Sequence, residues 1–202
     1  MSEFKRSGIF KYLLGRGWLR INGWQFKGDL PDTGRFMLVC APHTSNWDFV
    51  YLLAVMFIMR IKVSWMGKHT LFKKPFGGFM RWLGGIPIDR RSSHGVVDQI
   101  ADHFAADENL IIAIAPAGTR KFTDHWKSGF YHIAHKAQVP LLLGFLDYEN
   151  KIAGTGPAFV PSGNVTEDMD KVRAFYGDIR GANPEDESTI ILRDEMEAPV
   201  RD

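Results

Sequence analysis

Hydrophobic residues come in short runs that alternate with longer segments of mixed character from Arg35 onward. Several runs are apolar at consecutive positions, without the hydrophobic and polar alternation of a half-exposed strand. Such runs are typical of strands that helices cover on both faces of a largely parallel sheet. The predicted strands are residues 36–41, 63–66, 85–88, 110–115 and 140–146.

The longer segments between these runs have the spacing of helices. The predicted helices are residues 47–60, 70–83, 95–107, 127–138 and 167–179. A late segment, residues 151–160, contains two glycines and is predicted to be an edge strand that Pro161 closes. Strands that alternate with helices predict an α/β fold: a single-domain layered sandwich with a mostly parallel mixed central sheet flanked by helices.

The chain is long enough for one sizeable core, because 202 residues with 45% hydrophobic content fall within the size range of one domain. We expect this domain at residues 35–180, after an amphipathic peripheral segment at residues 1–34. A mostly polar and acidic tail follows at residues 181–202 and contains the apolar triplet 190–192. We expect this tail to be disordered apart from one docking patch.

Charge and cysteine content narrow the class of protein. Lys and Arg number 25 against 23 Asp and Glu, and a net charge of +2 argues against a nucleic acid as partner. The single cysteine, Cys40, lies in an apolar run and indicates a buried thiol in a reducing compartment, which favours the cytoplasm. The longest apolar run, residues 49–59, is far shorter than the roughly 20 residues of a membrane-spanning helix.

The first segment with candidate chemistry is residues 41–48, which read Ala-Pro-His-Thr-Ser-Asn-Trp-Asp. His43 and Asp48 can meet only if the histidine lies in the turn after the strand and the aspartate in the first helical turn, with Thr44, Ser45 or Asn46 as the N-cap between them. A carboxylate bonded to one ring nitrogen would leave the other free to take a proton from a hydroxyl. The alternative is a surface histidine beside a capping aspartate.

Two further segments end in an arginine. Residues 84–90 read Gly-Gly-Ile-Pro-Ile-Asp-Arg, and Arg90 at the end of the predicted strand suits a phosphate, unless it is a solvated partner of Asp89. Residues 110–120 form a buried run that breaks at a proline. Gly118 there would let the backbone approach a ligand, while Thr119 and Arg120 offer a hydroxyl and a cation. An ordinary strand-to-loop turn is the alternative for this segment.

In this order the three segments resemble the motifs of the glycerolipid acyltransferase superfamily, the PlsC-like lysophosphatidic acid acyltransferases. The resemblance covers about residues 35–159, including a weaker motif at residues 139–143, and implies a glycerol-3-phosphate acyltransferase-like fold. It implies that His43 and Asp48 are the catalytic pair and that Arg90 binds phosphate. It also assigns Gly118, Thr119 and Arg120 to the acceptor site.

One position departs from the family pattern. Ala117 stands where the third motif has glutamate, and a methyl group can neither accept a hydrogen bond nor offset a neighbouring cation. A deliberately altered sequence, a natural variant with a different acceptor and a member with weakened turnover all fit this change. Because His43 and Asp48 are present, we expect part of the chemistry to survive.

The resemblance implies transfer of a fatty-acyl group from acyl-CoA or acyl carrier protein to a hydroxyl of a lysophospholipid or glycerophosphate-type acceptor. His43 would be the general base. No metal or other cofactor is expected, because a thioester is already activated. Two alternatives stay open: a lipid-binding or regulatory protein with a compromised site, and a thioester hydrolase in which the histidine activates water.

Two segments, residues 9–21 and 68–83, mix aromatic and basic residues, as at sites that contact an anionic membrane surface. The alternative is that these aromatic residues fill the core. His125, His132 and His135 could suggest a metal site, but no carboxylate falls at the spacing of a metal-binding motif. We therefore expect these histidines to be solvated or hydrogen-bonded.

Overall fold

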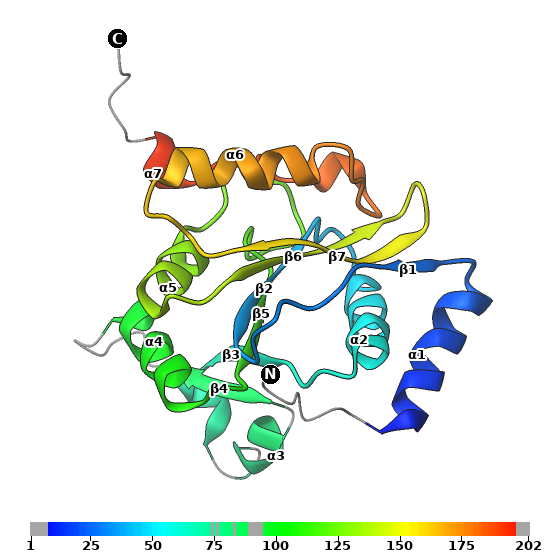
Figure 1. The fold of residues 1–202 in the computed structure, drawn as a ribbon, viewed down its shortest axis with the longest axis horizontal. Coiled ribbons are helices and arrows are strands. Elements are labelled where there is room, and N and C mark those ends of the chain that lie inside the picture. The colour runs from blue at the N-terminus through cyan, green and yellow to red at the C-terminus, as the bar shows by residue number, and fades with distance from the viewer. Residues whose placement is uncertain (1–7, 74, 76, 83, 89–94, 197–202) are drawn as a thin grey trace.

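The computed structural model describes residues 8–73, 75, 77–82, 84–88 and 95–196, which form a layered α/β domain (Figure 1). Its sheet has seven strands in the order β1-β7-β6-β2-β5-β3-β4, and neighbouring strands are parallel except for the antiparallel pair β6 and β7. The strands are β1 Gln25–Lys27, β2 Phe36–Ala41, β3 Ser64–Lys68, β4 Gly85–Ile88, β5 Ile111–Ile114, β6 Leu141–Asp147 and β7 Ile152–Phe159. The predicted fold class is confirmed.

Helices cover both faces of the sheet, so the central strand β2 is buried on both sides. Met37 and Val39 join the core beneath α4, α5 and α6, whereas Phe36 and Leu38 face the side that α1 and α2 cover. The helices are α1 Ile9–Ile21, α2 Asp48–Met59, η1 His69–Phe72, α3 Gly77–Trp82, α4 Val96–Ala106, α5 Gly129–Ala137, α6 Val165–Tyr176, η2 Pro184–Asp186 and α7 Arg193–Met196.

Two predicted elements differ in the structure. The single helix expected at residues 70–83 is instead η1 followed by α3, with Pro75 between them, because a proline disfavours helical backbone in the preceding residue. The strand expected at the edge of the sheet, β7, lies inside it. Strand β1 pairs with it in parallel, and Gly154 permits this approach, since a Cβ there would lie 1.7 Å from the carbonyl oxygen of Lys27.

The acidic tail is ordered over residues 181–196, contrary to the predicted disorder. The amide of Trp126 donates to Ile191 O at 2.8 Å, and that of Thr189 donates to Thr123 O at 3.1 Å. Leu192, from the apolar triplet, is fully buried in the core. We call residues 181–192 the C-terminal strap, because they run from the end of α6 back across the loop before α5.

Candidate active site

The loop that carries His43 follows β2, in the middle of the sheet between β5 and β6. Ligands in open α/β sheets bind beyond the carboxyl ends of the strands, where the sheet's connections diverge to either side. Helix α2 begins at Asp48, so the strand end and the helix start hold the two side chains on opposite sides of a short loop. The predicted placement, histidine in the turn and aspartate in the first helical turn, is what the structure has.

His43 and Asp48 are in direct contact. The ring Nδ1 lies 3.0 Å from Asp48 Oδ2, and the side chains are 29% and 6% exposed, respectively. An ionised carboxylate can only accept, so Nδ1 carries the proton and Nε2 is left to accept one from a substrate. The buried acid therefore fixes the tautomer of a ring that solvent can reach.

The loop between the two residues serves mainly the carboxylate. The N-cap residue is Trp47, whose side chain makes no capping bond, so the N-cap lies one residue beyond the predicted ones, and Ser45 Oγ accepts from the Trp47 amide at 3.2 Å. The amides of Thr44 and Ser45 each donate to Asp48 Oδ2 at 2.9 Å. The loop thus closes around its own aspartate.

A fourth donor reaches the same carboxylate from far along the chain. The hydroxyl of Tyr148, in the turn between β6 and β7, donates to Asp48 Oδ1 at 2.7 Å. Burial raises the pKa of Asp48, but the hydrogen bonds from His43, the Ser45 amide and Tyr148 outweigh it and leave the pKa below its ordinary value. The carboxylate is therefore ionised at neutral pH.

The third motif lies beside this pair. The Arg120 guanidinium donates to the side-chain oxygen of Asn46, two residues before Asp48, while Gly118, Thr119 and Arg120 are all exposed. Gly118 adopts a φ of +70°, and a Cβ there would lie 2.6 Å from the ammonium of Lys127. The turn thus has two cations near it, of which the sequence indicated only the first.

Arg90, the predicted phosphate anchor of the second motif, lies outside the described residues, as does Asp89. The described part of that segment ends with strand β4 at Ile88. The role of Arg90 stays a prediction.

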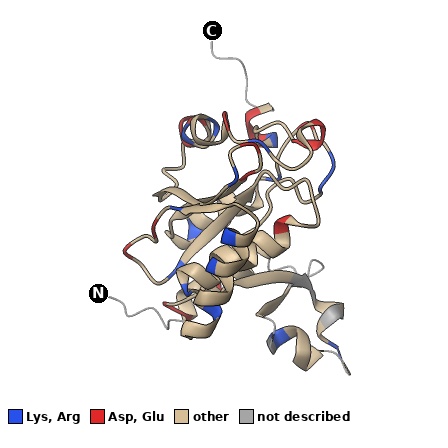
Figure 2. Cartoon of the chain, turned by 90° about the vertical axis from the view of Figure 1, so that its right-hand side faces the viewer, with Lys and Arg blue, Asp and Glu red and all other residues tan. Residues whose placement is uncertain are grey.

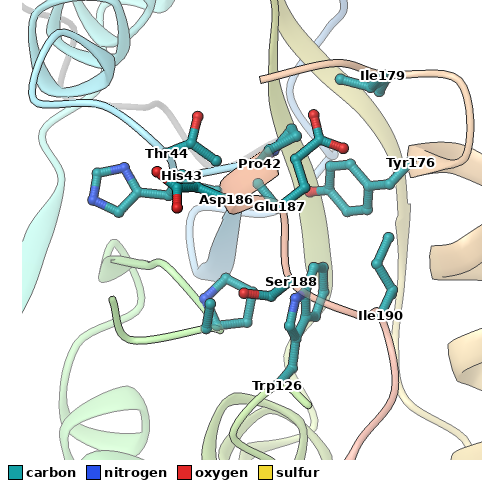
Figure 3. Close-up of a pocket in the computed structure, with 14 residues that line it drawn as sticks. Pro42, His43, Thr44, Trp126, Tyr176, Ile179, Asp186, Glu187, Ser188 and Ile190 are labelled. Atoms are coloured by element: carbon teal, nitrogen blue, oxygen red, sulfur yellow. The ribbon is translucent and has the colours of Figure 1, made fainter. Parts of the chain in front are cut away.

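Ala117 faces a small cavity of about 40 Å³ beneath the C-terminal strap, together with Trp126 and Tyr176 from the core and Asp186 and Glu187 from the strap. This volume holds a few water molecules and is too small for a fatty chain. His43 and Thr44 also line the cavity, so it borders the catalytic loop, while the ring of His43 points away from the core residues Tyr176 and Trp126 (Figure 3).

The strap holds the first motif against the third. The backbone amide of Asn183 donates to Thr44 Oγ1 at 3.1 Å, and its side-chain amide donates to the carbonyl oxygen of Thr44 at 2.7 Å. Farther along, Asp186 pairs with Lys121 at 2.9 Å, next to Arg120. The sequence did not indicate these contacts, although the apolar triplet that anchors the strap was visible in it.

The three histidines considered for a metal site are each hydrogen-bonded. His125 contacts Asp124 at 2.6 Å, His132 contacts Asp194 at 2.6 Å, and His135 contacts the carbonyl oxygen of Pro161 at 3.1 Å. Among the residues that the structure describes, no three His, Cys, Asp or Glu side chains are grouped so that they could hold a metal ion.

Comparisons with known proteins identify the family. The family model described as Acyltransferase matches residues 25–142, a range that contains all three motifs. Among solved structures, the chain is similar to the 1-acyl-sn-glycerophosphate (LPA) acyltransferase PlsC from Thermotoga maritima. That match has a TM-score of 0.50 and 16% identity, and covers 84% of this chain and 74% of that chain. A search of curated protein sequences finds no match.

Proposed function

Since the chain belongs to the Acyltransferase family and is an acyltransferase, we propose that it moves a fatty-acyl group from acyl-CoA or acyl carrier protein to a hydroxyl of a lysophospholipid or glycerophosphate-type acceptor. One observation carries this proposal. A half-exposed imidazole, oriented by a buried carboxylate at 3.0 Å, lies in the same loop as the residue that contacts Arg120. A base for an alcohol and a cation for an anionic head group thus share one edge of the sheet.

In the proposed reaction, Nε2 of His43 removes the proton from the acceptor hydroxyl, and the oxygen attacks the thioester carbonyl. The C–S bond then breaks as the C–O bond is completed, and the imidazolium returns its proton to the leaving thiolate. Asp48 keeps the ring in the required tautomer and stabilises the imidazolium. The proposal uses no metal or organic cofactor, because the thioester is already activated and the remaining task is to position and deprotonate the alcohol.

Acceptor recognition is assigned to the exposed third motif. The Arg120 guanidinium and the Thr119 hydroxyl would contact a phosphate, and Gly118 would let it approach the backbone. Lys127, beside Gly118, adds a second positive charge on the same turn. The proposal also keeps Arg90 as a predicted phosphate anchor.

Mass spectrometry of acylated products tests this function directly. The protein is incubated with acyl-CoA and with acyl carrier protein, each with a panel of lysophospholipid and glycerophosphate acceptors. We expect a new acylated lipid that His43→Ala reduces by about a thousand-fold or more, while the thermal unfolding midpoint stays near that of the wild type. Near-normal turnover in His43→Ala would refute the assignment of the base.

The same experiment separates the two alternatives. A thioester hydrolase would release free fatty acid at the same rate with and without acceptor. A lipid-binding protein would bind the acyl donor without producing any acylated acceptor. Either result would replace the proposed acyl transfer with that function.

Contact with an anionic membrane surface is part of the proposal. Helix α1 packs on α2 through Gly15 and Leu19, and a Cβ on Gly15 would lie 2.6 Å from Ala54 O. The opposite face of α1 is exposed and apolar, through Ile9, Phe10, Leu13, Leu14 and Ile21. Basic residues lie along the same helix, as the blue segments in Figure 2 show. Among the described residues, no helix has the length and apolar character that crossing a membrane requires.

The two candidate membrane segments differ in how many of their apolar side chains are exposed. In the second segment, Phe72 is buried, whereas Phe79 is 53% exposed, so its aromatic residues serve both the core and the surface. Flotation with anionic vesicles at low salt tests the exposed face of α1. We expect the wild type to float with the vesicles. The double variant Phe10→Ser/Leu13→Ser should remain unbound, and it should still fold because both changes leave the α2-facing side of the helix intact. A wild type that does not float would argue against membrane contact.

A further inference from the structure

Asp48 receives three hydrogen bonds from its own loop and helix start, and one from outside. The local donors are His43 and the amides of Thr44 and Ser45, all on Oδ2. The outside donor is the hydroxyl of Tyr148 on Oδ1. Building on the proposed function, we propose that Tyr148 is a positioning residue that holds the Asp48 carboxylate in the orientation in which Oδ2 faces His43.

The ring of Tyr148 is itself held in place. Its backbone amide donates to Arg180 O at 2.9 Å. Its ring meets Trp24 edge-on, with centroids 4.9 Å apart, and Tyr51 of α2 at 5.8 Å. Trp24 and Tyr51 also pack together, at 4.3 Å. The hydroxyl is therefore aimed at Asp48 by an aromatic cluster built from three segments that are far apart in sequence.

A buried carboxylate needs partners on both oxygens, because an unpaired acceptor in a dry site costs the full free energy of its desolvation. Without the Tyr148 hydroxyl, Oδ1 could regain a donor only by rotating toward the loop amides, and that rotation would move Oδ2 away from the imidazole. The hydroxyl thus closes the last open direction around the carboxylate. Its effect on the reaction is exerted through His43.

Tyr148 acts as a fixed donor rather than as an acid. Burial and the hydrogen bond to Asp48 raise the pKa of Tyr148 far above its ordinary value, so the hydroxyl keeps its proton at any working pH. The titratable groups around the carboxylate are His43 and Tyr148, and Tyr51 faces the latter. Removing the hydroxyl would therefore free the carboxylate to rotate, and the negative charge on Oδ2 would move away from the imidazole.

The test is Tyr148→Phe, with Tyr131→Phe as the matched control. Tyr131 donates to a second buried aspartate, Asp168, at 3.0 Å, on the α6 side of the sheet. We expect Tyr148→Phe to lower kcat about ten-fold, with KM for donor and acceptor changed by no more than about two-fold. We also expect the acid limb of the pH–rate profile to move to lower pH by about half a unit, since the imidazolium loses part of its stabilisation by Oδ2. Tyr131→Phe should leave kcat and the acid limb of the pH–rate profile unchanged.

A second measurement separates this proposal from the proposed function. NMR titration of the His43 imidazole, without substrate, should show the same downward displacement in Tyr148→Phe but not in Tyr131→Phe. An unchanged titration and an unchanged kcat in Tyr148→Phe would overturn the positioning role, as would equal changes in both variants. Failure of the proposed function would instead appear as no acylated acceptor from the wild type, whatever the titration shows.

Discussion

Two buried aspartates in this protein have nearly the same surroundings. Asp48 is 4% exposed and Asp168 is fully buried, and each lies in the first turn of a helix. Each accepts a tyrosine hydroxyl, from Tyr148 at 2.7 Å and from Tyr131 at 3.0 Å. Each also accepts backbone amides, and for each the hydrogen bonds outweigh burial and leave the pKa below its ordinary value.

The two aspartates differ in the charged partner. Asp168 pairs with Lys171 at 3.0 Å, an ammonium that keeps its proton at neutral pH. Asp48 pairs with His43, an imidazole that can both accept and donate a proton and that reaches solvent beside the third motif. A buried carboxylate with a tyrosine is thus a stabilising arrangement in itself. It becomes a candidate for catalysis only where its partner can release and take up a proton at the surface.

The largest effect is expected from Asp48→Asn. An amide in place of the carboxylate would favour the wrong tautomer of His43 and would not stabilise the imidazolium, so kcat should fall by about a thousand-fold or more, or at least ~4 kcal/mol in activation free energy. Steady-state acyl transfer measures this loss. Asp168→Asn should keep kcat within about three-fold of the wild type, and a comparable loss in both variants would erase the distinction.

Asp168→Asn should instead affect stability. It removes the buried negative charge and replaces one carboxylate oxygen by an NH2 donor, so either the Tyr131 hydroxyl and the Ser162 amide or the Lys171 ammonium loses its acceptor. We expect a loss of about 3 kcal/mol in the free energy of unfolding at pH 7. Urea unfolding measures it. Because the pKa of Asp168 is lowered in the fold, its contribution is present above the unfolded pKa and is lost as pH falls through the folded value. The difference in the free energy of unfolding between wild type and variant should therefore become smaller below about pH 4. A difference that does not change with pH would contradict this.

Arg120→Ala probes the exposed half of the site. Loss of one charge-assisted contact to an anionic acceptor should raise the acceptor KM about thirty-fold, with little change in the KM for the acyl donor. Lys121→Ala is the control, because Lys121 is exposed and already paired with Asp186. Equal effects of the two changes would mean that general positive charge, rather than Arg120, attracts the acceptor.

The smallest effect is expected from Ala117→Glu. Restoring the family carboxylate should raise kcat/KM for a glycerophosphate-type acceptor by about three-fold, because the negative charge would orient the cations of the third motif. Asp186 and Glu187 line the same cavity, and their like charge limits the gain. Ala117→Gln tests whether charge or size matters. If neither variant changes the rate or the acceptor affinity, position 117 is not part of the site.

Much of the fold could be predicted because its signals are local. The bounds of β2, Phe36–Ala41, and of β4, Gly85–Ile88, match the prediction, since consecutive apolar residues mark a strand buried on both faces. Strand β1 was missed, because three residues are too few to show a hydrophobic periodicity. Its position depends on pairing with β7, which is far away in the sequence. The strap was missed because its composition indicates disorder, while its order depends on Leu192 and on contacts with Thr44 and Thr123.

The sequence by itself determined the layered α/β class, the contact between His43 and Asp48, and the exposed turn at Gly118. These depend on neighbours within a few residues, where spacing and side-chain chemistry limit the geometry. Only the tertiary structure decided what surrounds the carboxylate. Tyr148 comes from 100 positions away and Asn183 from 139 positions beyond the residue it holds, and such contacts exist only once the sheet and its covering helices have assembled.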